Sequence, residues 1–217
     1  PAKQAGRRWI NDNKLWIHDA GDAKAFDLLL VLYDTFEQHS QARRRTIIFM
    51  KTISIVLTNY PSHLSSFMET VYGYEYTHAS ICLDAMNEKM YSFNYKGFCM
   101  ETVSKYKRHG VEKSISFQLQ VTDAAFERLQ NKIEQFVENR EDFCYSSIGV
   151  VFCFVHIPFK RKKHYFCSQF VAEILAESGA LKLKRRPSLY LPNHFYRELK
   201  EAAELQEIQY DILPEAV

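Results

Sequence analysis

The hydrophobic pattern of residues 114–137 changes its period at one point, and that change sets the fold class. Residues 114–121 (SISFQLQV) alternate strictly between polar and apolar side chains, which predicts a strand with Ile115, Phe117, Leu119 and Val121 facing inward. Thr122 or Asp123 then caps a helix, because the apolar residues that follow recur at helical spacing. These residues are Phe126, Leu129, Ile133, Phe136 and Val137. A strand followed directly by an amphipathic helix predicts an α+β fold in which helices pack on a sheet.

The same two patterns recur through the rest of residues 52–212. Further strands are predicted at 52–58, 76–83, 89–94 and 208–212, and further helices at 62–72, 166–178 and from Asn193. Gly73 and Gly179 follow two of these helices, where glycine accepts the left-handed backbone that ends a helix. Residues 148–157 form an apolar segment that Pro158 interrupts.

Residues 1–45 have a different pattern. A polar stretch leads to one predicted helix, which Asp22 caps and whose apolar residues are Phe26, Leu29, Leu30, Tyr33 and Phe36. The segment ends on three consecutive arginines at 43–45. We therefore predict two parts, a helical extension at residues 1–45 and an α+β domain at residues 46–217.

The overall composition excludes several classes of protein. A chain of 217 residues with 47% hydrophobic and 25% charged residues is globular. Its net charge of +2 is too balanced to indicate a nucleic-acid partner, and none is expected. The longest aliphatic run, residues 28–32, is far shorter than the about 20 apolar residues that span a bilayer, so no transmembrane segment is predicted. The first residues also lack the apolar stretch of a signal peptide.

The cysteines argue against a disulfide or metal framework. There are five of them, an odd number, at irregular spacings and without a Cys-x-x-Cys pair. We therefore expect a reducing compartment such as the cytoplasm, and neither a metal nor another cofactor. The cysteines are then buried small apolar residues, with at most one nucleophile among them; they are Cys82, Cys99, Cys144, Cys153 and Cys167.

Cys167 has the surroundings that activate a thiol. It lies in the first turn of the helix predicted at 166–178, where unpaired backbone N–H groups and the helix dipole favour an anion. Four cationic residues, 160–163, precede it. Such surroundings lower the pKa of a cysteine from about 8.5 and favour the reactive thiolate. A buried helix cysteine is the commoner role for this residue type, so the spacing alone leaves both interpretations open.

His78 is the candidate base. It lies on an alternating strand, with Ser80 and Cys82 on its face and Ala79 and Ile81 on the other. A strand holds an imidazole rigidly, as a Cys–His pair requires, although this strand taken alone favours an edge or core histidine bonded to a backbone carbonyl. His164, three residues before Cys167, is a weaker candidate because a basic loop normally keeps it in solvent.

A third residue is expected to orient the imidazole, as in catalytic triads generally. If the hairpin turns about Met86, residue 94 lies opposite 78 and residue 92 lies opposite 80. Asn94 or Ser92 is then positioned to accept a hydrogen bond from Nδ1 of His78. Both stay candidates, as does a role as ordinary strand residues.

Two segments carry a resemblance to a known family. The segments YTHASICLD (76–84) and HYFCSQFVAEIL (164–175), in this order, resemble the permuted branch of the NlpC/P60 papain-like superfamily, in which the histidine strand precedes the cysteine helix. KMYSFN (89–94) and PFKRKK (158–163) also resemble uncharacterised bacterial members of this branch. The resemblance covers residues 50–213.

The resemblance implies a papain-like α+β fold, with an antiparallel sheet packed against the helix that bears the cysteine. It implies hydrolysis of an amide or ester bond, or acyl transfer, through a thioester, with Cys167 as nucleophile and His78 as base. Members of the branch often have an acidic, amide or histidine side chain as the third residue, where this chain offers Ser92 or Asn94.

Three functions remain open at this point. The first is a Cys–His hydrolase that cleaves an amide bond in a peptide, including a cell-wall peptide, or an acyl bond in a lipid. The second is an acyltransferase on the same scaffold. The third is an inert binding module whose basic clusters, 160–163 and 182–186, meet an anionic partner, although a solvated surface is the more common role of such clusters. The expected partner is a peptide or acyl substrate, and the sequence predicts no oligomeric state.

Overall fold

The polypeptide divides into two units, Pro1–Ile48 and Phe49–Val217, each considered by itself. The computed structural model describes residues 7–10, 15–18, 50–61, 63–84 and 87–212. In the first unit, strands β1 (Arg7–Ile10) and β2 (Leu15–His18) pair antiparallel, which places Trp9 opposite Trp16. This hairpin is not predicted from the sequence. The helix predicted around residues 22–36 lies outside the described residues.

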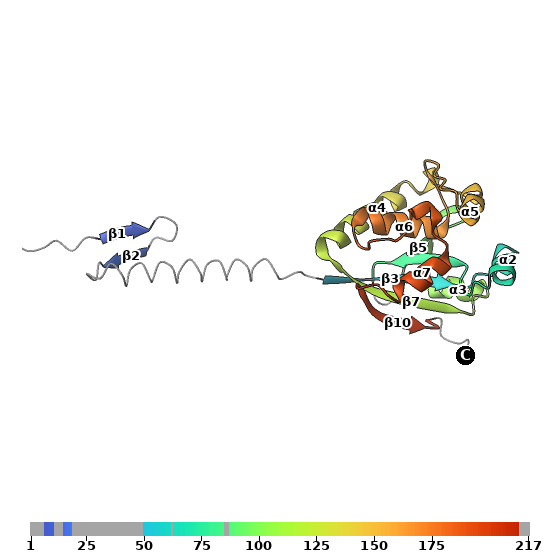
Figure 1. Cartoon of the computed structure of the whole chain (residues 1–217), viewed down its shortest axis with the longest axis horizontal. Coiled ribbons are helices and arrows are strands. Elements are labelled where there is room, and N and C mark those ends of the chain that lie inside the picture. The colour runs from blue at the N-terminus through green and yellow to red at the C-terminus, as the bar shows by residue number, and fades with distance from the viewer. Residues whose placement is uncertain (1–6, 11–14, 19–49, 62, 85–86, 213–217) are drawn as a thin grey trace, which may run out of the picture. The chain divides into compact units, whose positions relative to one another are not determined.

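Six strands of the second unit form one antiparallel sheet in the order β10-β7-β3-β4-β5-β6 (Figure 1). Their bounds are β3 (Met50–Thr58), β4 (His78–Cys82), β5 (Met90–Asn94), β6 (Gly97–Glu101), β7 (Ser114–Thr122) and β10 (Leu205–Tyr210). Strands β3 to β6 follow one another in the sheet as they do in the chain, while β7 pairs with the other side of β3. Ile55 of β3 consequently lies opposite both Ile81 of β4 and Phe117 of β7.

Helices occupy the connections between these strands. They are α2 (His63–Tyr72), α3 (Val103–Arg108), α4 (Asp123–Glu138), α5 (Ser147–Phe154), α6 (Cys167–Ser178) and α7 (Pro192–Leu199). Two short 3₁₀ turns, η1 (Arg140–Asp142) and η2 (Pro187–Leu189), and a parallel pair of two-residue strands, β8 (Cys144–Tyr145) and β9 (His164–Tyr165), complete the unit. No helix in the described part of the chain is long and apolar enough to cross a bilayer.

Local signals in the sequence place several helix ends correctly. The Thr122 hydroxyl accepts a hydrogen bond from the backbone N–H of Ala125 at 3.2 Å and so caps α4. Gly73 and Gly179 follow α2 and α6 with φ of 64° and 71°, the left-handed conformation predicted for them.

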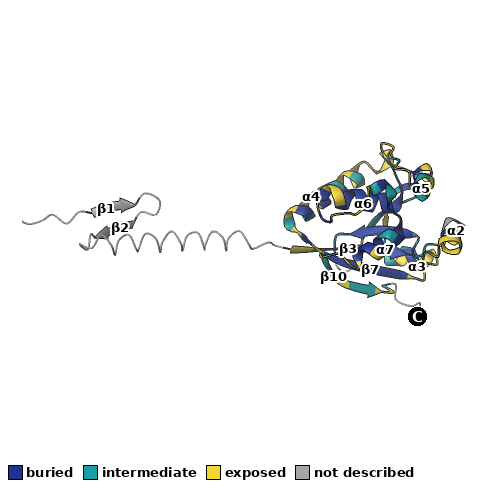
Figure 2. Cartoon of the chain, in the orientation of Figure 1, coloured by how far each residue is buried: buried dark blue, intermediate teal, exposed yellow. Residues whose placement is uncertain are grey.

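The main core lies between the sheet and helices α4 and α6 (Figures 1 and 2). All four inward residues predicted for β7 are buried, as are Leu129 and Ile133 of α4. Phe126 and Phe136 pack against this core at its margin, whereas Val137, predicted to join it, is exposed because it lies past the edge of the contact face. The predicted α+β class is confirmed, with the cysteine-bearing helix α6 packed on an antiparallel sheet.

A smaller cluster lies on the opposite face of the sheet, where Tyr106 of α3 packs against Val56, Cys82 and Met90. Alternate residues of β4 therefore serve two different environments: Ala79 and Ile81 join the main core, and Cys82 joins the smaller cluster.

Candidate active site

Cys167 is the first residue of α6, and only 7% of its surface is exposed. The side chain of His78 and the backbone of Ala79 and of Ser168 lie close to its sulfur. Burial alone would raise the pKa of Cys167, but the charge of His78 and the polar contacts with these three residues lower it below its ordinary value. The structure thus joins the predicted nucleophile to the predicted base.

The basic loop contributes less to this pKa than the sequence suggests. Lys160 bonds Glu173 at 2.8 Å and Lys163 bonds Asp142 at 2.6 Å, so two of the four cations are matched by carboxylates. The positive charge that lowers the pKa of Cys167 comes from His78. The imidazole of His164 contacts the basic loop, where its Nδ1 lies 2.9 Å from the carbonyl oxygen of Lys162.

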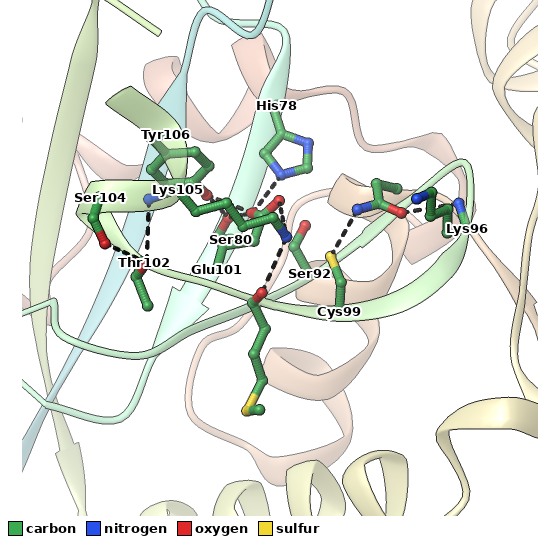
Figure 3. A network of polar contacts seen from close by, with 12 residues as sticks. His78, Ser80, Ser92, Lys96, Cys99, Glu101, Thr102, Ser104, Lys105 and Tyr106 are labelled. Carbon is green, nitrogen blue, oxygen red and sulfur yellow. Dashed lines mark hydrogen bonds and ion pairs between the residues drawn. The ribbon is translucent and has the colours of Figure 1, made fainter. Parts of the chain in front are cut away.

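His78 is the first residue of β4, and it is buried. Its Nε2 lies 2.9 Å from Oε2 of Glu101 (Figure 3). This contact leaves Nδ1 as the ring nitrogen for the sulfur of Cys167. Burial alone would lower the pKa of His78, but the Glu101 carboxylate and the Cys167 sulfur raise it to about 10. The imidazole is therefore held in its charged form near neutral pH.

Glu101 ends strand β6, and its side chain is 1% exposed. The same oxygen that meets His78 accepts hydrogen bonds from Ser80 at 3.0 Å and from the hydroxyl of Tyr106, as Figure 3 shows. Lys105 approaches the other oxygen at 3.8 Å. Burial alone would raise the pKa of Glu101, but His78 and these donors lower it to about 2. A buried carboxylate with this many donors stays ionised.

The candidates Ser92 and Asn94 do not fill the third position. The strand register agrees with the predicted alignment, since Ile81 lies opposite Tyr91 and Cys82 opposite Met90. However, the hydroxyl of Ser92 donates to the carbonyl oxygen of Ala79 at 2.7 Å. Asn94 bonds the sulfur of Cys99 at 3.3 Å and accepts from the backbone N–H of Lys96 at 2.9 Å. Ser92 thus ties β5 to the residue after His78, and Asn94 stabilises a turn.

Glu101 is missed from the sequence because β6 is not predicted, yet a signal for it exists. Residues 94–97 (NYKG) form a turn with Asn94 opposite Gly97, whose φ of 104° suits glycine. A turn of this composition after a strand predicts a hairpin, and Glu101 is the acidic residue that ends the returning strand.

Three of the other cysteines are unsuited to be nucleophiles. Burial raises the pKa of Cys82 and of Cys153 to about 12, and it raises the pKa of Cys99 as well. The sulfur of Cys82 also donates to the carbonyl oxygen of Lys89 at 2.9 Å. Cys144 is exposed.

A pocket of about 260 Å³ lies beside the start of α5, and Cys167 is not among the residues that line it. Its lining includes Tyr145, which is close enough to Cys167 for the thiolate to raise its pKa, after the larger effect of burial. Ile148 and Phe159 give the pocket apolar walls, and Arg161 gives it a cation. In the described residues, no group of three or more His, Cys, Asp or Glu side chains is arranged to hold a metal ion. No protein-family model, curated protein or solved structure matches this chain significantly.

Proposed function

We propose that this chain is a cysteine hydrolase that cleaves an amide or acyl bond through a thioester. One observation carries the proposal: the buried imidazole of His78 is hydrogen-bonded to the carboxylate of Glu101 and lies close enough to the sulfur of Cys167 for its charge to lower the pKa of that thiol. A nucleophile, a base and a residue that orients the base are the parts that nucleophilic catalysis by a thiol requires. Glu101 takes the third role instead of Ser92 or Asn94.

In the first half of the reaction, the Cys167 thiolate attacks the carbonyl carbon of the substrate, and a carbon–sulfur bond forms. The His78 imidazolium gives its proton to the leaving nitrogen or oxygen, whose bond to the carbonyl carbon breaks. The amine or alcohol departs and the acyl group stays on sulfur as a thioester. The backbone N–H groups in the first turn of α6 have no partner within the helix and supply hydrogen-bond donors for the oxyanion of this step.

In the second half, neutral His78 takes a proton from water while the water oxygen attacks the thioester carbonyl. The sulfur leaves as a thiolate, the imidazolium forms again, and a carboxylic acid is released. Glu101 holds the imidazole in one orientation through both halves and stabilises its charge.

We also propose that the fold is the permuted papain-like arrangement of the NlpC/P60 superfamily. The chain order supports it, since the histidine strand β4 precedes the cysteine helix α6 and both contribute to one antiparallel sheet-and-helix core. An inert module is a weaker alternative, because a buried imidazolium–carboxylate pair is costly to desolvate and has a clear use beside a thiolate. An acyltransferase differs only in the acceptor that resolves the thioester.

The proposal is tested with a panel of fluorogenic peptide amides and acyl esters. We expect turnover of at least one substrate class, and a mass increase equal to the acyl group on the peptide that contains Cys167. Cys167→Ala should abolish both signals, while Cys144→Ala, at an exposed thiol, should keep them. Added alcohols and amines separate a hydrolase from an acyltransferase by the product formed. Acylation that persists in Cys167→Ala would rule the mechanism out.

A further inference from the structure

Helix α5 turns an apolar face to solvent. Its inner residues, Gly149, Val150 and Cys153, are buried, and Val150 and Cys153 pack with Phe166, the residue before Cys167. On its outer side Ile148 is 59% exposed and Val151 is 63% exposed. The helix is therefore apolar on both faces, although only one face has a partner in the described part of the chain.

The exposed apolar residues continue beyond the end of α5. Val155 is 58% exposed and follows Ile148 and Val151 at helical spacing, so the three share one face. Ile157 is 50% exposed and stays close to the helix, because its N–H donates to the carbonyl oxygen of Phe152 at 2.9 Å. Single exposed apolar residues are ordinary, but a continuous set indicates an interaction surface. We name these four residues, Ile148, Val151, Val155 and Ile157, the α5 face.

Cations lie along the border of the α5 face. Phe152 stacks on Phe159 with ring centroids 4.9 Å apart, which holds the start of the basic loop against α5. Arg161 and Lys162 of this loop are exposed and have no carboxylate partner within the described residues, whereas Lys160 and Lys163 are paired. Exposed Arg186 lines one further pocket with Lys160 and Pro158. Two carboxylates also line this pocket, but Glu173 is paired with Lys160 and Glu177 with Lys132.

We propose that the α5 face docks on an anionic lipid bilayer. The four apolar side chains enter the interface, and Arg161, Lys162 and Arg186 meet the negatively charged headgroups. An apolar surface with a cationic border has this complementarity to an anionic bilayer. A second copy of the chain fits less well, because the two cationic borders would repel one another. A nucleic acid would leave the apolar residues unpartnered.

Docking in this orientation places the pocket that contains Tyr145, Ile148 and Arg161 at the membrane, and Tyr145 lies near Cys167. Ile148 belongs both to the α5 face and to the pocket wall, and Arg161 belongs both to the cationic border and to the pocket. The substrate is then a lipid that carries an acyl bond and an anionic group. This assignment of a substrate rests on the proposed hydrolase function, but the binding of the bilayer does not.

Binding is tested by co-sedimentation of the full chain with vesicles. The protein carries Cys167→Ser so that no hydrolysis alters the lipid. Vesicles of phosphatidylcholine alone are compared with vesicles of phosphatidylcholine mixed with phosphatidylserine. We expect binding to the mixed vesicles, and we expect added salt to weaken it. Ile148→Asp with Val151→Asp should reduce the partition coefficient about tenfold or more, and Arg161→Glu with Lys162→Glu should reduce it by a similar factor.

Matched controls lie elsewhere on the second unit. Met100→Asp with Tyr210→Asp changes two residues that are 52% and 59% exposed on other strands, and Lys107→Glu with Arg108→Glu reverses two exposed cations on α3. Both controls should bind as the parent does, and circular dichroism establishes that every variant is folded. Equal losses in the controls, or no binding of the parent, overturn the proposal. It is also overturned if the α5 variants convert an oligomer to a monomer without any effect on vesicle binding. The vesicle-binding result does not depend on whether the chain hydrolyses any substrate, because the tested protein carries Cys167→Ser. Failure of the hydrolase proposal and failure of the docking proposal can therefore be told apart.

Discussion

Nε2 of His78 and Oε2 of Glu101 lie 2.9 Å apart in a buried site, and each group keeps the other charged. The pKa of His78 rises from 6.5 to about 10, and that of Glu101 falls from 4.5 to about 2, although burial opposes both shifts. The imidazolium is consequently available near neutral pH to stabilise the thiolate of Cys167, so Glu101 influences the pKa of this thiol through His78.

Glu101→Gln should raise the pKa at which Cys167 becomes reactive. The amide keeps the size of the side chain and its hydrogen bonds but removes the negative charge, so the imidazolium loses its main stabilisation. The rate of alkylation by iodoacetamide against pH measures the shift, and we expect the inflection to move toward the free-cysteine value of about 8.5. Glu198→Gln is the control, since Glu198 is another buried carboxylate but bonds Tyr190 at 2.7 Å. An unchanged inflection in Glu101→Gln would contradict the assigned role.

His78→Ala should move the same inflection upward by more than His164→Ala does. His78 contacts the sulfur and is buried, whereas His164 bonds the carbonyl oxygen of Lys162 in the basic loop. Solvent and salt screen charges in such a loop. The pH dependence of alkylation is again the measurement. A larger shift in His164→Ala would place the base in the loop.

Cys167 should be the first of the five thiols to react at slightly acidic pH. Its pKa is lowered by His78, while burial raises the pKa of Cys82, Cys99 and Cys153. Cys144 is exposed and is therefore the competitor to follow. Limited iodoacetamide labelling with peptide mapping by mass spectrometry measures the order. If Cys144 or a buried thiol is modified first in the folded protein, the nucleophile is misassigned.

The His78–Glu101 pair should stabilise the fold within a limited pH range. The lowered pKa of Glu101 gives stabilisation that is present above pH 4.5 and lost as the pH falls through about 2. The raised pKa of His78 gives stabilisation that is present below pH 6.5 and lost as the pH rises through about 10. The pair therefore contributes most between pH 4.5 and 6.5.

Urea unfolding measures this contribution on a Cys167→Ser background, which removes the titration of the thiol. Glu101→Gln should lower the free energy of unfolding most between pH 4.5 and 6.5, by up to the about 3–5 kcal/mol that breaking a buried ion pair costs. The difference should shrink as the pH rises and His78 loses its proton in the Cys167→Ser parent too. This loss should occur below pH 10, because the background lacks the Cys167 sulfur that helps Glu101 to raise the pKa of His78 to about 10. A difference that is constant across this range would show that the charges are not responsible.

Local patterns in the sequence predicted the parts of this fold that depend on neighbouring residues. The alternation of β7 and the cap at Thr122 depend on a few adjacent positions, and both are confirmed. The position of Cys167 at a helix start is confirmed for the same reason. The prediction that Val137 joins the core is wrong, because helical spacing gives the direction of a side chain but not the extent of the sheet beneath it.

The third residue of the site could not be chosen from strand pairing alone. The predicted register for Ser92 is correct, but backbone register does not determine which side-chain partner satisfies a polar group. The hydroxyl of Ser92 donates to the carbonyl oxygen of Ala79, and the imidazole of His78 is hydrogen-bonded to the carboxylate of Glu101 on β6. Finding Glu101 required recognition of the short strand β6 after the turn at 94–97.

Consecutive pairing of β3 to β6 also has a consequence for the order of assembly during synthesis. His78, Ser80, Glu101 and Tyr106 lie within one short stretch of the chain, so their network forms from contacts that are available before the ribosome has reached Cys167. The thiol then gains its activating neighbour only when α6 docks on β4, which requires most of the second unit to be translated. The nascent chain thus carries a prepared imidazolium but no activated sulfur, and reactivity appears as a late product of folding.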